Sequence, residues 1–599
     1  MTENNNKIDT SLGTDSASLY ASVAGMAAPL LDDECMFLPG AGGGSHPMTL
    51  DVLQAMDQCR NFGTVQAHVE TIAAGLPALS GHRDAITKVL EFLINRGLMV
   101  SAESMLASIT SRASEETLPA PLTCVIFTDQ RPLALKRLAT SLGAYESHFG
   151  RGLRYTVIDQ SRSKEMVERN ASALSPLRDT GAVIDHLDRE WQRRLIAHLA
   201  GNAGLTVETL HGALAGTTGT GGGLNLALLL SAGSRCILMD DQFALNGMQR
   251  PGAKTGLDIR PQAGEPLTLA RDAETLRTSL LPLNEDPMAL PLALCGANLG
   301  TVLTRQGLAG ELAGLPYSVL QEFTHDCQVL TATLGSWGDS RYPDSQWLYR
   351  ISPDALGSQL ESRDTYYEFL RRPALARGFG QVQVSRVGRS APGLIDNRNL
   401  LPPAPVGSLD DRFGFQTWLH FIYPASAAIS VPVLLEYRAH LSPQVQATPL
   451  PPSPARFLGE LALVRMDECA AEDPTNRFHY LSAVYQDLAA GSSEHLQEAL
   501  RQFLVHTSSD RIRQIQQAMD ATGQAPEYWR ADAKNWLEFE VAQLSGDSAP
   551  LLAGWDPGFD GAQAAESLRE TVGSSASLLR HWPGLWTACQ GHFEELVGL

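Results

Sequence analysis

Three short apolar runs constrain the fold of this chain more than any other feature of its sequence. They occupy residues 124–127, 155–158 and 236–239, and stretches with helical spacing, such as residues 133–142, separate them. Runs of this length are typical of strands that are buried on both faces of a sheet. Their alternation with helices predicts an α/β domain over residues 118–445, with a mainly parallel, Rossmann-like sheet that carries helices on its faces.

The segments on either side of this domain have a different character. Residues 1–18 are polar and are expected to be a disordered tail, whereas residues 19–112 show apolar positions at helical spacing. Within the latter, an amphipathic stretch at residues 86–93 is followed by Gly97 and a β-prone run at residues 98–100. Helix, glycine stop and strand are typical of a winged-helix-like module, although a helical packing domain fits the pattern equally well.

The C-terminal part of the chain reads as helical. A proline-rich segment at residues 446–456 is the best linker candidate, and residues 457–599 contain no strand-like run. We therefore expect a separate helical domain at the C-terminal end of the chain.

Charge and cysteine usage exclude several classes of protein. The 46 Lys and Arg residues against 66 Asp and Glu residues leave a net charge of −20, which disfavours a surface that coats nucleic acid. The eight cysteines are scattered without a CxxC pair, as expected in a reducing compartment. Neither a secretory signal nor a membrane-spanning run is evident, so we expect a cytoplasmic protein.

The strand at residues 236–239 leads directly into two acidic residues, Asp240 and Asp241. Open α/β sheets bind their ligands at the carboxyl ends of the strands, and two adjacent carboxylates favour a divalent cation as their partner. The alternative is a pair of solvated aspartates in a turn. A glycine-rich turn at residues 219–223 precedes this strand and opens a helix that contains Asn225, where backbone N–H groups can approach a diphosphate closely.

Taken in order, the segments TCVIFTDQRPLALKRLATSL, YTVIDQS, GGGLNLALLLSAG and LMDDQ resemble the type-A fold glycosyltransferases, especially the family 2-like group. The resemblance implies a nucleotide-sugar donor, with a UDP-sugar favoured, and a Mn²⁺ or Mg²⁺ ion held by Asp241. The residues that it implies for donor binding are Thr128, Asp129, Arg131, Asp159, Gly222, Asn225 and Asp240. Gln242 departs from the commoner DDD or DxD motif, which puts the strength of metal binding in doubt.

A second acidic segment lies about 170 residues later. Asp410 and Asp411 precede an aromatic, helix-like stretch, and the resemblance implies that one of them, Asp411 by its position, deprotonates the acceptor. It also implies that His440, which ends a strand-like run, is a second metal ligand. The competing interpretations are a polar loop before a core helix and an ordinary surface histidine. Arg386 and Arg389 are further candidates to neutralise a diphosphate.

The resemblance thus implies a metal-dependent glycosyltransferase that moves a sugar from a nucleotide-sugar donor to an acceptor, and it also implies that the anomeric centre inverts. A winged-helix-like unit joined to a modifying enzyme resembles the leader-peptide recognition modules of peptide natural-product pathways, which suggests a peptide or a small natural product as acceptor. Two alternatives stay open. One is a sugar-phosphate nucleotidyltransferase, although the first strand ends in TDQRP rather than in a GxGxR-type loop. The other is a catalytically inactive, transferase-like binding protein, which the Gln242 departure allows.

Overall fold

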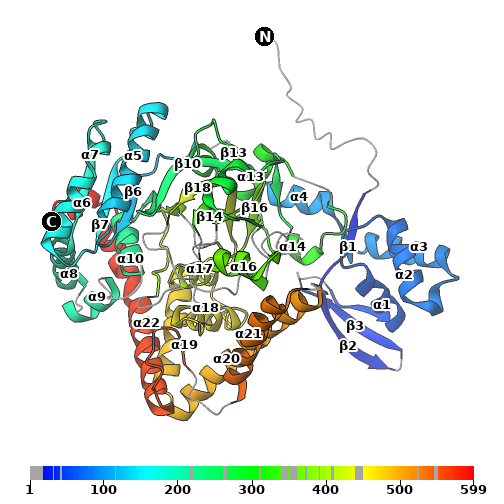
Figure 1. Ribbon diagram of the computed structural model, residues 1–599. Coiled ribbons are helices and arrows are strands. Elements are labelled where there is room, and N and C mark those ends of the chain that lie inside the picture. Colours follow the sequence, from blue (N-terminus) through cyan, green and yellow to red (C-terminus); the bar gives the residue numbers. More distant parts are fainter. Residues whose placement is uncertain are drawn as a thin grey trace, which may run out of the picture. The chain divides into compact units, whose positions relative to one another are not determined.

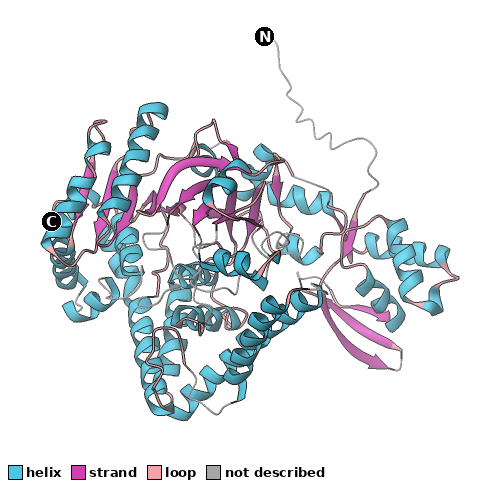
Figure 2. Ribbon diagram, viewed as in Figure 1, coloured by secondary structure: helices cyan, strands magenta, loops and turns pink. Residues whose placement is uncertain are grey.

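The computed structural model describes most of the chain, namely residues 18–31, 33–40, 44–114, 117–203, 206–214, 221–260, 266–308, 312–339, 348–349, 360–371, 374–389, 392–405, 411–438, 450–521, 525–545 and 551–599. The chain divides into two compact units. The first comprises residues 1–114, 258–261 and 298–327, and the second comprises the remainder. Figure 1 gives the labels of the elements, and Figure 2 shows the helices and strands of each unit.

The first unit combines a small sheet with short helices. Its elements in chain order are β1 (Tyr20–Ser22), β2 (Gly25–Leu31), β3 (Glu34–Pro39), β4 (His46–Thr49), α1 (Leu50–Gln58), α2 (Val65–Gly75), η1 (Pro77–Leu79), α3 (Arg83–Asn95), β5 (Met99–Ser101), α4 (Ala102–Thr110), α13 (Leu299–Gln306) and α14 (Tyr317–Gln321). The antiparallel ribbon β2–β3–β4 and the pair β1–β5 are its sheets among the described residues.

The predicted sequence of helix, glycine stop and strand is confirmed in this unit. Helix α3 buries Ile86, Leu90 and Leu93, and the chain leaves it through Gly97, whose φ of 71° favours glycine. The ribbon β2–β4 was not predicted, because β2 and β3 are mostly apolar without the alternation that indicates a half-buried strand, and β4 is only four residues long. Strand β2 lies at the edge of this ribbon, and its residue Met26 is 74% exposed.

The boundaries of the first unit differ from those expected from the sequence. Residues 298–327 were placed in the α/β domain, but they pack within the first unit, where α13 meets α4. Gly300 permits this approach, since a Cβ there would lie 2.5 Å from the carbonyl oxygen of Ile109. A close contact between segments this distant along the chain leaves no local signal in the sequence.

The second unit is built on a mixed sheet. Its long path begins with the two-residue strand β11 (Leu257–Asp258) and continues, in spatial order, through β16 (Val382–Ser385), β18 (Ser426–Tyr437), β14 (Gln328–Asp339), β17 (Gly393–Asn397), β9 (Ser234–Asp240), β6 (Thr123–Thr128), β7 (Tyr155–Asp159) and β8 (Ile184–Leu187). The strands β10 (Phe243–Gln249), β12 (Leu267–Ala270), β13 (Leu281–Pro282) and β15 (Ala374–Arg377) pair alongside this path.

The predicted strands β6, β7 and β9 are confirmed, but the sheet is mixed rather than mainly parallel. Strands β8, β7, β6 and β9 are parallel neighbours, whereas β17 runs antiparallel between β9 and β14. Strand β14 in turn pairs in parallel with β18 and antiparallel with β15. The apolar runs in the sequence reveal that these strands are buried, but they contain no information about strand direction.

Helices cover both faces of this sheet (Figure 1). Helix α5 (Pro132–Phe149) packs with α6 (Lys164–Ala173) and α7 (Ser175–Arg178). One large apolar core joins the opposite face of β6 and β9 to α8 (Arg189–Ala203), α10 (Gly221–Leu230) and α17 (Asp411–Ile422). The smaller helices α9 (Val207–Leu214), α11 (Ala273–Thr278), α12 (Ala289–Leu294) and α16 (Arg363–Arg371) complete this part of the unit.

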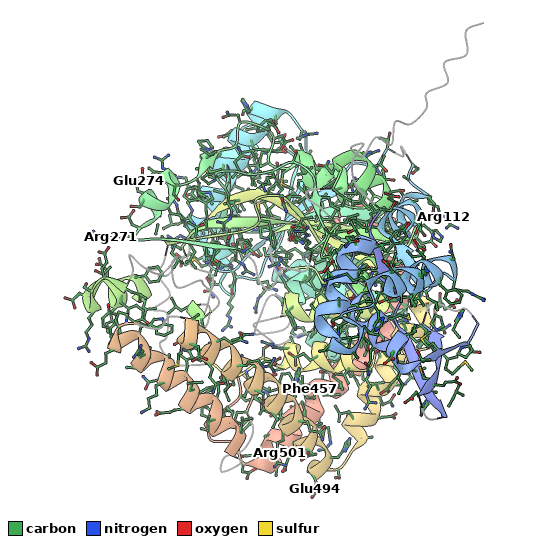
Figure 3. All side chains as sticks on the ribbon, turned by 90° about the vertical axis from the view of Figure 1, so that its right-hand side faces the viewer. Arg112, Arg271, Glu274, Phe457, Glu494 and Arg501 are labelled. Atoms are coloured by element: carbon green, nitrogen blue, oxygen red, sulfur yellow. The ribbon has the colours of Figure 1, made fainter. Side chains whose placement is uncertain are left out.

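Most of the C-terminal helices share that core instead of forming a separate unit. They are α18 (Pro454–Val464), α19 (Pro474–Ala490), α20 (Ser493–Ala521), α22 (Gly561–Cys589) and α23 (Phe593–Val597). Helix α21 (Glu527–Ser545) belongs to the same unit, but its Trp529 and Trp536 pack in a second apolar cluster with residues of α16. Figure 3 shows Phe457 inside this helical layer and Glu494 and Arg501 at its outer surface. Ser453 caps α18 and is buried, so the described part of the predicted linker is the start of a packed helix.

Candidate functional site

The order of the parallel strands reverses between β6 and β9. The chain passes from β6 outward to β7 and β8, and then returns to form β9 on the other side of β6. In open α/β sheets, a reversal of strand order opens a ligand crevice at the carboxyl ends of the two strands. Strand β6 ends at Thr128 and β9 at Asp240, while β14 and β18 run in the same direction and end at Asp339 and Tyr437. The predicted donor and metal residues on β6 and β9 therefore lie at one edge of the sheet.

Asp241 directly follows β9 at this point, is fully buried, and joins the two strands. Its backbone N–H donates to the carbonyl of Phe127 at 3.1 Å, and its Oδ2 accepts a hydrogen bond of 2.7 Å from the Thr128 hydroxyl. The Arg131 Nε atom is 3.0 Å from the same oxygen, whereas Oδ1 is buried without a hydrogen-bond partner. Burial raises the pKa of Asp241 to about 7, although Arg131 and Thr128 both favour its carboxylate form. This carboxyl group therefore lacks a full set of partners.

Asp240 is held by a different cation. The Arg412 guanidinium donates to its Oδ1 at 2.6 Å, and the two side chains are 10% and 15% exposed for Arg412 and Asp240 respectively. Arg412 lies in the first turn of α17 and also stands 5.8 Å from the centre of the Phe127 ring. Sequence reasoning did not identify Arg412, although it directly follows the acidic pair Asp410 and Asp411.

The turn between β6 and α5 is conformationally unusual. Gln130 has a φ of 53°, which a non-glycine residue rarely adopts, and its N–H donates to the Ser161 hydroxyl at 2.8 Å. Pro132 then begins α5 at a position where the missing N–H is not required. The neighbouring Asp129 is exposed at the crevice. Backbone strain of this kind concentrates at functional sites, where the surrounding structure holds it in place.

Asp159 ends β7 directly beside Thr128, but its carboxylate is already occupied within the protein. It accepts hydrogen bonds from Ser161 N at 2.9 Å, Asn170 Nδ2 at 3.0 Å and His186 Nε2 at 2.9 Å. Burial raises the pKa of Asp159, yet these hydrogen bonds outweigh it and hold the pKa below the usual range. Asp159 is thus part of a hydrogen-bond network within the protein. Its contact with the nucleotide-sugar donor stays a prediction.

Asn225 and Gly222 lie on α10, as the sequence predicted. The Asn225 side chain exchanges two hydrogen bonds with the backbone of Ala404, at 3.0 and 2.7 Å, and is completely buried. Gly222 lies in the first turn of α10, and at the adjacent Gly223 a Cβ would stand 3.1 Å from the Phe127 ring. The glycines thus bring the start of α10 close to the end of β6, whereas Asn225 anchors the segment before α17.

Two of the predicted residues, Asp410 and His440, lie outside the described residues. Asp411 is the first residue of α17, next to Arg412, and nothing is described of its side chain. The aromatic residues of α17 serve mainly as core: Trp418 is fully buried and donates to the Tyr485 hydroxyl at 2.8 Å. Arg412 therefore connects the start of α17 to Asp240. That Asp411 or Asp410 deprotonates the acceptor stays a prediction.

A divalent cation fits only part of this site. Among the described residues, no three His, Cys, Asp or Glu side chains lie close enough to hold a metal ion. Arg412 and Arg131 occupy Asp240 Oδ1 and Asp241 Oδ2, but the orphaned Asp241 Oδ1 is the kind of hard oxygen ligand that Mg²⁺ and Mn²⁺ prefer. Asp241 can thus supply one ligand, with phosphate oxygens and water as the other ligands.

Further charged groups surround the same edge. The pKa of Arg137 is lowered overall, by burial and by the nearby Arg438. The acidic groups of Glu436, Asp241 and Asp339 only partly oppose this shift. Arg137 donates to the Arg438 carbonyl at 3.1 Å, and Asn246 donates to Glu436 at 2.5 Å. The edge therefore alternates cations with anions, an arrangement that can receive a ligand carrying both a diphosphate and a metal ion.

Comparison of the chain with protein-family models, curated proteins and solved structures yields no match. Within the described part of the chain, no helix is both long and apolar enough to cross a membrane. All eight cysteines are buried and free of disulfide bonds.

Proposed function

We propose that the crevice at the ends of β6 and β9 binds a nucleotide sugar, and that the protein transfers the sugar to an acceptor with inversion. The observation that carries this proposal is Asp241 at the reversal of strand order, with one oxygen bound to Thr128 and Arg131 and the other buried and unpartnered. Burying a carboxylate with one oxygen unpartnered is costly, and such a group at the carboxyl end of a strand is typical of a functional site.

The charges around Asp241 suit a leaving nucleoside diphosphate. Arg131, Arg137 and Arg412 place guanidinium groups along this edge, where they can bind phosphate oxygens and stabilise the charge that develops as the glycosidic bond breaks. A divalent cation, when bound at Asp241, would supply further charge stabilisation for the diphosphate. The approach of the donor would lower the pKa of Asp241 if it brings such a cation.

The acceptor side of the proposal rests on helix α17. Because Arg412 binds Asp240, the first turn of this helix is held against the donor edge, and Asp411 lies one residue away from that contact. Asp411 would accept the proton of the attacking acceptor group, as a general base must lie within hydrogen-bond reach of it. For a peptide acceptor, the exposed edge strand β2 of the first unit is a surface to which an extended segment can add a strand.

Replacement of Asp411 by asparagine tests the catalytic part of this proposal. With UDP-, GDP- and TDP-sugars and Mn²⁺, we expect the wild-type protein to release nucleoside diphosphate and the Asp411→Asn variant to lose about 10²- to 10⁴-fold in kcat. Binding of the donor, measured by calorimetry, should be unchanged because Asp411 acts on the acceptor. Asp410→Asn is the matched control, with a much smaller effect expected.

The same assay separates the alternatives. Formation of pyrophosphate from a sugar phosphate and a nucleoside triphosphate would identify a nucleotidyltransferase instead. Donor binding that persists without turnover in the wild-type protein, across every acceptor offered, would point to a binding protein. Failure of every nucleotide sugar to bind would contradict the proposal as a whole.

A further inference from the structure

The Asp241 carboxyl group, on which the proposed function rests, is out of reach of solvent in this structure. Its side chain is fully buried, and Oδ1 lacks a hydrogen-bond partner. Oδ2 accepts a hydrogen bond from the Thr128 hydroxyl at 2.7 Å and lies 3.0 Å from Arg131 Nε. A ligand can therefore contact this carboxyl group only after a neighbouring side chain has moved away from it.

Of the two side chains that contact Oδ2, Arg131 is the one that can move. Thr128 is 2% exposed and ends β6, which pairs with β7 on one side and with β9 on the other. The Arg131 side chain is 25% exposed and precedes the first residue of α5. Among the described residues, its ion pair with Asp241 is the only one that it forms. Because an arginine side chain has several rotatable bonds, its guanidinium can leave Asp241 without a change in the backbone.

The second guanidinium group beside the acidic pair is held more firmly. Arg412 is 10% exposed and donates to Asp240 at 2.6 Å, and its guanidinium stands 5.8 Å from the centre of the Phe127 ring. Its helix, α17, packs in the large apolar core through residues such as Trp418. We therefore expect Arg412 to stay with Asp240, which leaves Arg131 as the exchangeable cation.

A diphosphate is the kind of ligand that can draw Arg131 away. Guanidinium groups bind phosphate oxygens through paired, charge-assisted hydrogen bonds, and a diphosphate carries more negative charge than the single carboxylate of Asp241. Arg131 follows the carboxyl end of β6, where open α/β sheets receive their ligands. Departure of Arg131 would leave Asp241 with Thr128 as its partner and with an anionic oxygen beside the phosphates. Carboxylate and phosphate oxygens are ligands that Mg²⁺ and Mn²⁺ prefer.

We propose that Arg131 is an exchangeable cover for Asp241: it pairs with Asp241 in the free protein and transfers to the diphosphate of an incoming nucleotide. Asp241 is then available to a divalent cation only when the nucleotide is present. The inference rests on the proposed function, because the nucleotide-sugar donor supplies the diphosphate. Since coupling between two ligands is reciprocal, the nucleotide and the cation should each raise the affinity of the protein for the other.

Titration of the full-length protein with Mn²⁺ alone, followed by the electron paramagnetic resonance signal of free Mn²⁺, tests the cover. At pH 8 and without nucleotide, we expect Arg131→Ala to bind Mn²⁺ at least about tenfold more tightly than the wild-type protein. The gain should be absent from the double variant Arg131→Ala/Asp241→Asn, because it depends on the Asp241 carboxylate. Arg162→Ala is the matched control: it removes the same charge from an exposed position after β7 and should change the affinity by less than about twofold.

Titration with UDP, GDP and TDP tests the transfer of Arg131 to the diphosphate. In EDTA, we expect Arg131→Ala to weaken binding of the preferred nucleotide at least about tenfold, because a charged hydrogen bond to phosphate is lost. Saturation with that nucleotide should raise the Mn²⁺ affinity of the wild-type protein, and this increase should be at least about tenfold smaller in Arg131→Ala. Chelation of Mn²⁺ by the diphosphate itself is common to both proteins and cancels from the comparison. Arg131→Lys retains a cation and should restore most of the wild-type increase.

The outcomes separate this inference from the proposed function. Equal Mn²⁺ affinities of wild type and Arg131→Ala without nucleotide would show that Arg131 does not cover Asp241 and would overturn the inference. Unchanged nucleotide affinity of Arg131→Ala in EDTA would overturn the transfer while leaving nucleotide binding in place. Failure of all three nucleotides to bind the wild-type protein would contradict the proposed function and this inference together. Arg131→Gln, which also removes the charge, replaces Arg131→Ala if that variant does not fold, and the same gain in Mn²⁺ affinity is expected.

Discussion

Replacement of Asp241 by asparagine is expected to abolish nucleoside diphosphate release and, at pH 8, to stabilise the fold. The activity should fall by at least about 10²-fold, because the variant loses the anionic oxygens that organise the site around the diphosphate. The stability gain arises because burial raises the pKa of Asp241 from 3.8 to about 7. The wild-type protein must therefore keep a poorly compensated carboxylate buried at pH 8, at a cost of about 4 kcal/mol.

The pH dependence of this stability gain has a defined sign. The pKa of Asp241 is higher in the folded protein than in the unfolded chain. Its contribution to stability is therefore fully present below about pH 4 and is lost as the pH rises to about 7. The difference in unfolding midpoint between Asp241→Asn and wild type should therefore be small at pH 4 and reach its full size by pH 8. Thermal unfolding across this range measures it.

The neighbouring residue supplies a contrasting control. Asp240→Asn removes the negative charge of a mostly buried ion pair and leaves the Arg412 guanidinium without its counter-ion, so the unfolding midpoint should fall. At pH 8, Asp240→Asn and Asp241→Asn are thus expected to shift the unfolding midpoint in opposite directions. A lower midpoint for Asp241→Asn at every pH would refute the view that Asp241 lacks a full set of partners.

Removal of the Asn225 side chain is expected to destabilise the protein by about 2–4 kcal/mol, because it leaves the backbone N–H and C=O of Ala404 buried without partners. Asn225→Ala should therefore lower the unfolding midpoint strongly, whereas the exposed Asn476→Ala should change stability by less than about 0.5 kcal/mol. Chemical denaturation of both variants measures the difference. An effect of Asn225→Ala no larger than that of the control would contradict the structural role.

Donor titration of the folded Asn225→Ala variant separates that role from the one implied by the family resemblance. If Asn225 contacts the donor directly, affinity should fall even at temperatures where the variant is folded. If Asn225 acts only through Ala404, the affinity of the folded variant should stay near the wild-type value.

The sequence predicted the local elements of the site well, because their signals are local. The apolar runs identify β6, β7 and β9, and Pro132 and the glycines before Asn225 indicate where α5 and α10 begin. The acidic pair at the end of β9 was also found by its position after a buried strand. These predictions depend on residues within a few positions of one another.

The connections that make the site were not predictable in this way. Thr128 and Asp241 are 113 residues apart, Arg412 and Asp240 are 172 apart, and Asn225 and Ala404 are 179 apart. Nothing in the local pattern around Asn225 distinguishes an amide that contacts a ligand from one that holds a loop.

The sequence by itself therefore determined that the chain contains an α/β sheet with a pair of carboxylates at the end of a buried strand, since periodicity and strand length are properties of neighbouring residues. The tertiary structure alone decided the antiparallel placement of β17, the union of the C-terminal helices with the sheet, and the partners of each polar side chain. The physical reason is that burial and hydrogen bonding depend on segments that meet only when the chain folds, and these set both the pKa of Asp241 and the hydrogen bonds of Asn225 with Ala404.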